Sequence, residues 1–210
     1  MAKKTRETAE QTRVQLLEAA RALFLEHGVA KTTLEQIAKR AGYTRGAIHW
    51  HFKNKVEIFQ AMTALVSDPL IVRLDEIMLE HPELNQIDAI AASFKALIYE
   101  LETNHAIRET FIVTHRRCEF TDEFKDLKEI ILKPSDDCFL KLVKAFTKAK
   151  SEDLIRQNID VVTAAEITQS FMFGMISRWV DNEGESAFKV KPEVVIDNFF
   201  NTLKRNDAYN

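Results

Sequence analysis

The sequence has few of the residues that interrupt helices or cross-link chains. Its 210 residues include five glycines, four prolines and two cysteines. Two cysteines are too few for a disulfide framework, and a reducing compartment would keep both as thiols. Apolar residues recur at three- and four-residue spacing almost throughout, without the alternation that is typical of strands. The pattern predicts an all-α protein.

Long apolar runs are also missing. No uninterrupted stretch approaches the roughly 20 apolar residues that a membrane span needs, and the charged segment from Met1 to Arg6 is not followed by an apolar signal region. We therefore expect a cytoplasmic protein without a membrane partner. Its 46% hydrophobic content is enough to build a core, which argues against disorder.

The patterns that mark enzymes and metal sites are not found either. The sequence has no nucleophile elbow, phosphate-binding loop or paired carboxylates. His115 and Cys118 are spaced i, i+3, and His49 lies close to His51, but neither pair has the further ligands that zinc needs. We therefore expect no catalytic activity, no metal and no cofactor.

Charge is distributed unevenly along the chain. Residues 1–55 carry 11 basic and 5 acidic side chains, a net charge of +6, whereas the remaining 155 carry 18 and 27, a net charge of −9. A basic segment followed by an acidic body indicates that the N-terminal part meets a polyanion. Charge alone leaves the question open, because a basic end is often only a solvated surface.

Helix boundaries follow from caps, glycines and prolines. The first helix is expected to start at Thr8 and to end at Gly28. Another is expected to start after Asn54 and to be closed by Asp68-Pro69. An amphipathic stripe from Ile87 to Leu101 predicts the next helix. Further helices are expected over four segments: Ile107–Phe120, Glu123–Lys150, Val161–Asn182 and Glu193–Arg205.

Three residues refine these later segments. Pro134 is expected to kink or divide the segment that begins at Glu123, because it removes one backbone donor. Pro192 suits the first turn of the last helix. Asp160 and Thr163 are alternative caps for the helix near Val161.

Two short helices after residue 32 have the dimensions of a helix-turn-helix. Thr33 and Gln36 form a capping box at the start of the first, Gly42 supplies a left-handed stop, and Thr44 caps the second at once. The second helix offers donors and aromatic edges that suit phosphates and base edges in a major groove. These side chains are Thr44, Arg45, His49, Trp50 and His51.

The two segments Thr33–Ala38 and Ala41–Lys55 closely resemble the N-terminal signature of the TetR family of transcriptional repressors. The likeness covers about the first quarter of the chain. A weaker likeness in Cys118–Asp122 and Gly174–Trp179 resembles the multidrug-efflux subgroup typified by AcrR and TtgR. The resemblance implies a three-helix DNA-binding domain over residues 1–54 and a helical effector-binding and dimerisation domain over residues 55–210.

The resemblance also implies roles at the DNA for the start of each short helix. Thr33 and Thr44 would hold phosphates with hydroxyl and backbone donors, since the helix dipole favours an anion there. Arg45 would read a base edge, expected to be guanine. Gly46 and Ala47 would let the helix backbone approach the groove closely.

The rest of the second helix would contact sugar and phosphate. These contacts are expected from Trp50, His51 and Lys55. His49 stands where the family usually has Tyr, and its imidazole can still donate to a phosphate, with a possible dependence on pH. Ile48 and Phe52 are expected to face the core of the small domain.

The C-terminal part has more apolar side chains than a connector requires, so we expect a cavity for a small hydrophobic effector. Nine residues fall on inward-looking faces by spacing, and several match pocket positions of the resembled subgroup: Phe94, Leu97, Phe111, His115, Cys138, Leu142, Met172, Phe173 and Ile176. Ordinary core packing is the simpler explanation for any single apolar member. His115 is expected to be the polar anchor.

A homodimer is expected because one short recognition helix reads only a few base pairs. Glu123–Lys150 and Val161–Asn182 are expected to form a four-helix bundle with their symmetry mates. Candidate aromatics in that bundle are Phe139, Phe146 and Phe171.

Together these features predict a repressor that binds a palindromic operator in double-stranded DNA as a homodimer. A small hydrophobic effector would release it, and the controlled operon would encode a multidrug efflux pump. Three alternatives stay open. They are an activator, a regulator of lipid or metabolic genes that senses a fatty acid or acyl-CoA, and a helical ligand-binding or partner-binding protein whose basic head serves only solubility.

Overall fold

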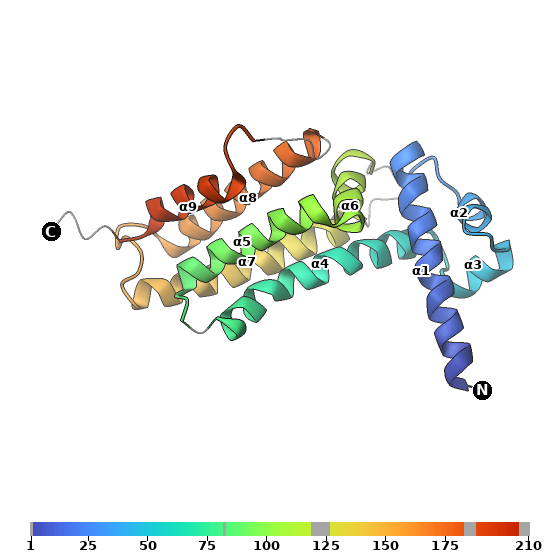
Figure 1. Cartoon of the computed structure of the whole chain (residues 1–210), viewed down its shortest axis with the longest axis horizontal. Helices are drawn as coiled ribbons and strands as arrows, with labels where there is room; N and C mark the ends of the chain where they lie inside the picture. Colours follow the sequence, from blue (N-terminus) through green and yellow to red (C-terminus); the bar gives the residue numbers. More distant parts are fainter. Residues whose placement is uncertain (1, 82, 119–126, 183–187, 206–210) are drawn as a thin grey trace. The chain divides into compact units, whose positions relative to one another are not determined.

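The computed structural model describes residues 2–81, 83–118, 127–182 and 188–205 (Figure 1). Within them the chain forms nine helices and one isolated β-bridge, between Ile155 and Lys204. The helices are α1 Ala2–His27, α2 Leu34–Arg40, α3 Arg45–His51, α4 Lys55–Glu80, α5 Gln86–Thr103, α6 His105–Arg116, α7 Leu127–Ser151, α8 Val161–Asp181 and α9 Pro192–Leu203. The all-α class is confirmed. Over the described ranges, no helix combines the length and the apolar character that crossing a membrane requires.

The helices fall into two compact units. The first consists of Met1–Val66 and Glu109–Ile131, and the second of Ser67–Arg108 and Leu132–Asn210. The sequence-based boundary between residues 54 and 55 differs from this division. The difference arises because the first turns of α4 and the later turns of α6 pack into the same core as α1, α2 and α3.

One face of α3 packs into the core of the first unit. Ile48 of α3 is fully buried, and Phe52 directly after it is nearly so. Both were expected to face inward, which is confirmed. The rings of Phe24 in α1 and Phe59 in α4 lie 6.4 Å apart in the same core, and Val113 of α6 is fully buried there. With its apolar face fixed in this way, α3 presents its other residues to the surface.

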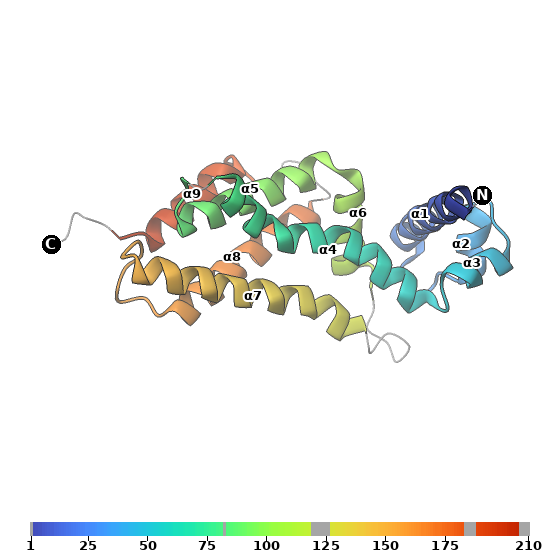
Figure 2. The same ribbon diagram turned by 90° about the horizontal axis from the view of Figure 1, so that it is seen from below.

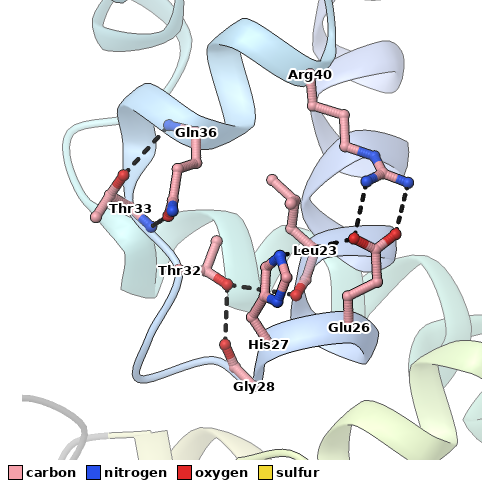
Figure 3. A network of polar contacts seen from close by, with 8 residues as sticks. All are labelled: Leu23, Glu26, His27, Gly28, Thr32, Thr33, Gln36 and Arg40. Carbon is pink, nitrogen blue, oxygen red and sulfur yellow. Dashed lines mark hydrogen bonds and ion pairs between the residues drawn. The ribbon is translucent and has the colours of Figure 1, made fainter.

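Polar contacts fix the start and the end of α2 (Figure 3). The Thr33 hydroxyl accepts from the Gln36 N–H at 3.2 Å, while the Gln36 side-chain oxygen accepts from the Thr33 N–H at 2.8 Å. This is the capping box that the sequence predicts. In the last turn, the Arg40 guanidinium pairs with Glu26 of α1 at 2.7 Å. The two contacts tie α2 to its loop and to α1.

The turn between α2 and α3 is a Schellman motif followed directly by a cap. Gly42 has φ +77°, and its N–H donates to the Lys39 carbonyl at 3.2 Å. The Tyr43 N–H donates to the Ala38 carbonyl at 2.8 Å, which completes the motif. Thr44 then caps α3. The stop at Gly42 and the cap at Thr44 are confirmed.

Several helix boundaries differ from the sequence-based expectation. α1 begins at Ala2, so Thr8 lies inside it, because nothing from Ala2 to Thr8 breaks a helix. Pro69 does not close α4, and Pro134 does not divide α7. Each proline removes only one backbone donor, and helices of 26 and 25 residues keep their remaining backbone hydrogen bonds.

The other boundaries lie close to those expected. Asp160, rather than Thr163, caps α8, since its carboxylate accepts the Thr163 N–H at 2.9 Å. Pro192 is in the first turn of α9, as expected. α6 ends at Arg116, and the expected limits Phe120 and Glu123 lie outside the described residues.

In the second unit, α5, α7, α8 and α9 run lengthwise in both views (Figures 1 and 2). α5 packs on α9, where the rings of Phe94 and Phe200 lie 5.6 Å apart. The Arg108 guanidinium lies 5.4 Å from the ring centre of Trp179, which is buried on α8. The core of this unit is therefore apolar and rich in aromatic rings.

Candidate nucleic-acid interface

α3 turns a polar and aromatic face to the surface of the first unit. Arg45, His49 and Trp50 are exposed, and 74% of Trp50 is accessible. Burying an indole in a protein is favourable by several kcal/mol at most sites. Together with the neighbouring basic side chains, the exposed indole offers an aromatic face and hydrogen-bond donors to a partner at this surface.

The first turn of α3 has little side-chain cover. Gly46 is exposed and Ala47 is half-buried. A Cβ added at Gly46 would lie 3.9 Å from the Thr44 hydroxyl, which is ordinary contact. Glycine inside a helix costs up to about 1 kcal/mol relative to alanine, and the packing of the described residues does not require it here. Glycine at this position instead favours close approach by a partner outside the chain.

Thr33 and Thr44 place two exposed hydroxyls at neighbouring helix starts. Thr33 caps α2 by accepting from Gln36, and Thr44 caps α3 by accepting from the Ala47 N–H at 3.2 Å. A hydroxyl oxygen that accepts in a cap can still donate its own hydrogen. Both side chains are thus positioned by the fold and available to an acceptor at the surface.

Arg45 carries an ion pair that the sequence pattern did not single out. Its Nε lies 3.2 Å from a carboxylate oxygen of Glu35 on α2, and 71% and 53% of the two side chains are accessible. The sequence alone does not reveal this pair, because the two residues are ten positions apart and lie on different helices. Glu35 is therefore a member of the surface that only the fold reveals.

His51 and α1 complete the face. The edge of the Trp50 ring meets the half-buried His51 ring at 4.6 Å and 88°. Partial burial lowers the pKa of His51, the nearby positive charge of Arg13 lowers it further, and Glu10 opposes the shift. The Arg13 guanidinium also lies 5.3 Å from the ring centre of Phe52. Sequence reasoning missed Arg13, because only the fold brings α1 next to the end of α3.

Lys55 differs from the other predicted DNA contacts because it is buried. Only 8% of its side chain is accessible, and its ammonium donates to the Ala30 carbonyl oxygen at 3.1 Å. Two residues earlier, 87% of the Lys53 side chain is accessible. The fold brings the other eight predicted residues to the surface or its margin, and it directs Lys55 into the loop between α1 and α2.

The nine predicted effector contacts are divided between the two units. Phe111 and His115 belong to the first, and the other seven belong to the second. Four of the residues in the second unit are buried, namely Phe94, Leu97, Leu142 and Ile176. Cys138 and Met172 are half-buried, and 44% of Phe173 is accessible.

His115 is exposed on α6, although its spacing predicted an inward-looking face, and it makes local contacts on its own helix. Its ring stacks on Phe111 at 5.7 Å, and its Nδ1 lies 2.9 Å from the Phe111 carbonyl oxygen. Nδ1 also lies 3.1 Å from the Thr114 hydroxyl. The neutral tautomer with its proton on Nδ1 donates to the Phe111 carbonyl and leaves Nε2 as an acceptor. Partial burial lowers the pKa of His115, which favours this neutral form. His115 thus suits a ligand that donates a hydrogen bond, such as a hydroxyl compound.

The two cysteines are protonated thiols in this fold. Burial raises the pKa of Cys118 to about 11, and burial also raises the pKa of Cys138. Among the described residues, no group of three or more His, Cys, Asp and Glu side chains is arranged to hold a metal ion.

Comparison with known proteins gives the family of the chain. Residues 16–62 match the model described as bacterial regulatory proteins, tetR family, and residues 88–205 match the C-terminal region of MAATS-type transcriptional repressors. The second match spans more than half of the chain. The chain belongs to the TetR family.

Relatives from three bacteria illustrate this TetR-family membership. The chain is 33% identical over 183 residues to the transcriptional regulator TtgR of Pseudomonas putida, covering 86% of this chain and 85% of TtgR. NalD of Pseudomonas aeruginosa, the secondary repressor of the MexAB-OprM multidrug efflux pump, has a TM-score of 0.79 and 26% identity, with 95% and 99% of the chains covered. SmeT of Stenotrophomonas maltophilia, in a complex with triclosan, has a TM-score of 0.81 and 27% identity, with 94% and 93% covered.

The aromatics expected at a TetR-family dimer interface occupy different environments. Phe146 is fully buried inside its own chain, so its expected role between subunits is wrong. Phe171 stacks on Phe199 of α9 at 4.0 Å, and Phe139 is half-buried. Other apolar side chains on α7 and α8 are exposed instead, namely Leu140, Val162, Ile167 and Phe173.

Proposed function

We propose that this TetR-family protein represses a multidrug-efflux operon. As a homodimer it binds a palindromic operator in double-stranded DNA, and a small hydrophobic effector releases it. The protein acts in the cytoplasm, where its operator lies, and has no enzymatic activity.

The observation that carries the proposal is the exposed face of α3. A buried Ile48 anchors the helix, while Arg45, His49 and Trp50 stand at the surface and Gly46 leaves the backbone open. Arg can fork onto a guanine edge, and a helix with small residues in its first turn fits closely into a major groove. The positive net charge of residues 1–55 supports attraction to phosphates.

The relatives support the efflux assignment and the nature of the effector. NalD and SmeT are both described as repressors of multidrug efflux pumps, and SmeT is found with triclosan, a small hydrophobic molecule. The neutral His115 ring, with Nε2 as an acceptor, is compatible with a hydroxyl compound of this kind.

The dimer follows from the geometry of the duplex. Two copies of α3 must reach successive major grooves, which lie roughly 34–36 Å apart along one face of the DNA. Exposed apolar side chains on α7 and α8 supply surface for pairing, with Leu140 64% and Phe173 44% accessible. Sedimentation at micromolar concentration tests this directly, because a monomer there would contradict the proposal.

The energy required for release is modest. A hundredfold loss of operator affinity needs about 2.7 kcal/mol of coupling between effector and DNA. The effector must bind the released conformation more tightly than the operator-bound one by that same amount.

The proposal is tested by selecting bound duplexes from a random pool and measuring their affinity by gel shift. We expect a palindromic consensus whose preference over scrambled DNA disappears with Arg45→Ala. Arg40→Ala is the matched control, because Arg40 lies on α2 and pairs with Glu26 of α1. If Arg45→Ala kept the operator preference, the assignment of α3 as the helix that contacts the bases, the reading helix, would be wrong.

Effector screening separates the remaining readings. Release by hydrophobic phenols, weakened in His115→Ala, supports the efflux repressor. Release only by fatty acids or acyl-CoA would indicate a regulator of lipid genes. Salt-sensitive binding without any protected sequence would indicate a ligand-binding protein whose basic head does not read DNA.

A further inference from the structure

We propose that Glu35 is a specificity-determining residue of the DNA interface, and that it acts by positioning Arg45. This inference rests on the proposed operator binding and goes beyond it, because it assigns a function to an acidic residue on a surface that otherwise attracts phosphates.

The geometry of the pair leaves the reading end of Arg45 available. Glu35 holds Nε of Arg45 at 3.2 Å, from the neighbouring helix α2. A guanidinium has five N–H donors, and the four on its two terminal nitrogens form the fork that matches the O6 and N7 atoms of guanine. Contact at Nε therefore fixes the direction of the side chain without occupying that fork.

Glu35 also competes with DNA phosphates for the Arg45 guanidinium. Arg45 is 71% accessible, so without a partner its guanidinium could turn to any nearby phosphate oxygen. Phosphate contacts supply nearly all of the affinity for non-specific DNA. While Glu35 holds Arg45, the pair is neutral as a whole and gives little of that affinity. Non-specific binding is then penalised, whereas operator binding keeps its guanine contact.

A second ion pair in the same unit supplies the control. Glu26 of α1 meets Arg40 of α2 with two contacts, at 2.7 and 2.9 Å (Figure 3). Glu26→Gln removes the same charge as Glu35→Gln and also breaks a partly exposed arginine pair. It does not involve the reading helix α3.

The experiment compares full-length wild type with Glu35→Gln on two probes. One is the duplex selected from the random pool, and the other is its scrambled version of equal length and composition. For Glu35→Gln we expect tighter binding to the scrambled duplex and unchanged or weaker binding to the selected one. The ratio of the two affinities should fall by about tenfold for a dimer, which carries two exposed ion pairs of this kind.

The salt dependence gives a readout that a purely structural role would not change. Freed from Glu35, each Arg45 can neutralise one more phosphate, so the slope of log affinity against log salt on the scrambled duplex should steepen by about 0.9 per subunit. In the Arg45→Ala background, Glu35→Gln should leave that slope unchanged, because no guanidinium is released.

Each result bears on a definite claim. An affinity ratio unchanged by Glu35→Gln, or lowered equally by Glu26→Gln, overturns the inference while the operator-binding function stands. A wild type that prefers no duplex overturns the proposed function itself.

Discussion

Replacing Lys55 with methionine should weaken the fold of the first unit more than it weakens DNA binding. The Lys55 ammonium donates to the Ala30 carbonyl at 3.1 Å, and 8% of the side chain is accessible. Methionine keeps most of the apolar stem and removes the charged donor. The loop between α1 and α2, which contains Ala30, should lose an attachment to α4.

The size of the effect follows from the contact that is lost. A hydrogen bond to a charged group contributes about 1.5–3 kcal/mol, and an acceptor left without its donor adds a desolvation penalty. The contact is only partly buried, so we expect a loss of about 1–2 kcal/mol in the free energy of unfolding. Lys53→Met is the matched control, because 87% of Lys53 is accessible, and its effect should lie within about 0.5 kcal/mol of zero.

Urea unfolding followed by far-UV circular dichroism measures the stability, and salt titration of operator affinity measures the phosphate contacts. For Lys55→Met we expect a lower urea midpoint with an unchanged salt slope. The opposite outcome would refute the reasoning. A slope that fell by about 0.9 per subunit at an unchanged midpoint would make Lys55 a phosphate contact.

The remaining predictions concern the reading helix and the effector side. Gly42→Ala should destabilise the protein by about 1–2 kcal/mol, because Gly42 has φ +77°. Gly46→Ala should leave stability equal or slightly higher and should weaken operator binding. Equal urea midpoints for the two variants would contradict the predicted difference in stability. Ile48→Ala should cost about 2–5 kcal/mol, as expected for a fully buried side chain, and a loss under 1 kcal/mol in urea unfolding would argue against the packing of α3. Burial lowers the pKa of His115 below 6.5, so the unfolded chain takes up that proton first as the pH falls. The free energy of unfolding should therefore decrease from about pH 6.5 down through the folded-state pKa. His115→Gln should make the pH profile of unfolding shallower, and an unaltered profile would show that the imidazole is not desolvated.

The helix-turn-helix could be predicted from sequence because its signals are local. The capping box at Thr33, the left-handed Gly42 and the cap at Thr44 each act within four residues of the chain. Such short-range hydrogen bonds depend little on the rest of the fold. The buried face of α3, represented by Ile48, follows from the same helical spacing.

Features that depend on distant partners could not be predicted. Lys55 looks like a phosphate contact by residue type, and only its partner Ala30, 25 residues away, shows that it is buried. The prolines at 69 and 134 are strong local breakers, yet α4 and α7 continue through them. Glu35 pairs with Arg45 only because the α2–α3 turn brings the two residues together.

The candidate effector residues show the same limit. Helical spacing correctly places Phe94, Leu97 and Ile176 on inward faces, because periodicity reports which side of a helix is apolar. It cannot report which helix that side packs against. Phe173 fits the periodic stripe on α8 but lies largely at the surface.

The part that α6 plays in the first unit bears on how this protein can be engineered. Val113 is fully buried among residues of α1 and α4, and the Arg117 carbonyl accepts from the Val29 N–H at 2.9 Å. A fragment truncated after α4 would lose Val113 from this core and leave a cavity in it. A chimera that joins the helix-turn-helix to a different effector domain must therefore keep residues 109–118 together with the first 66 residues.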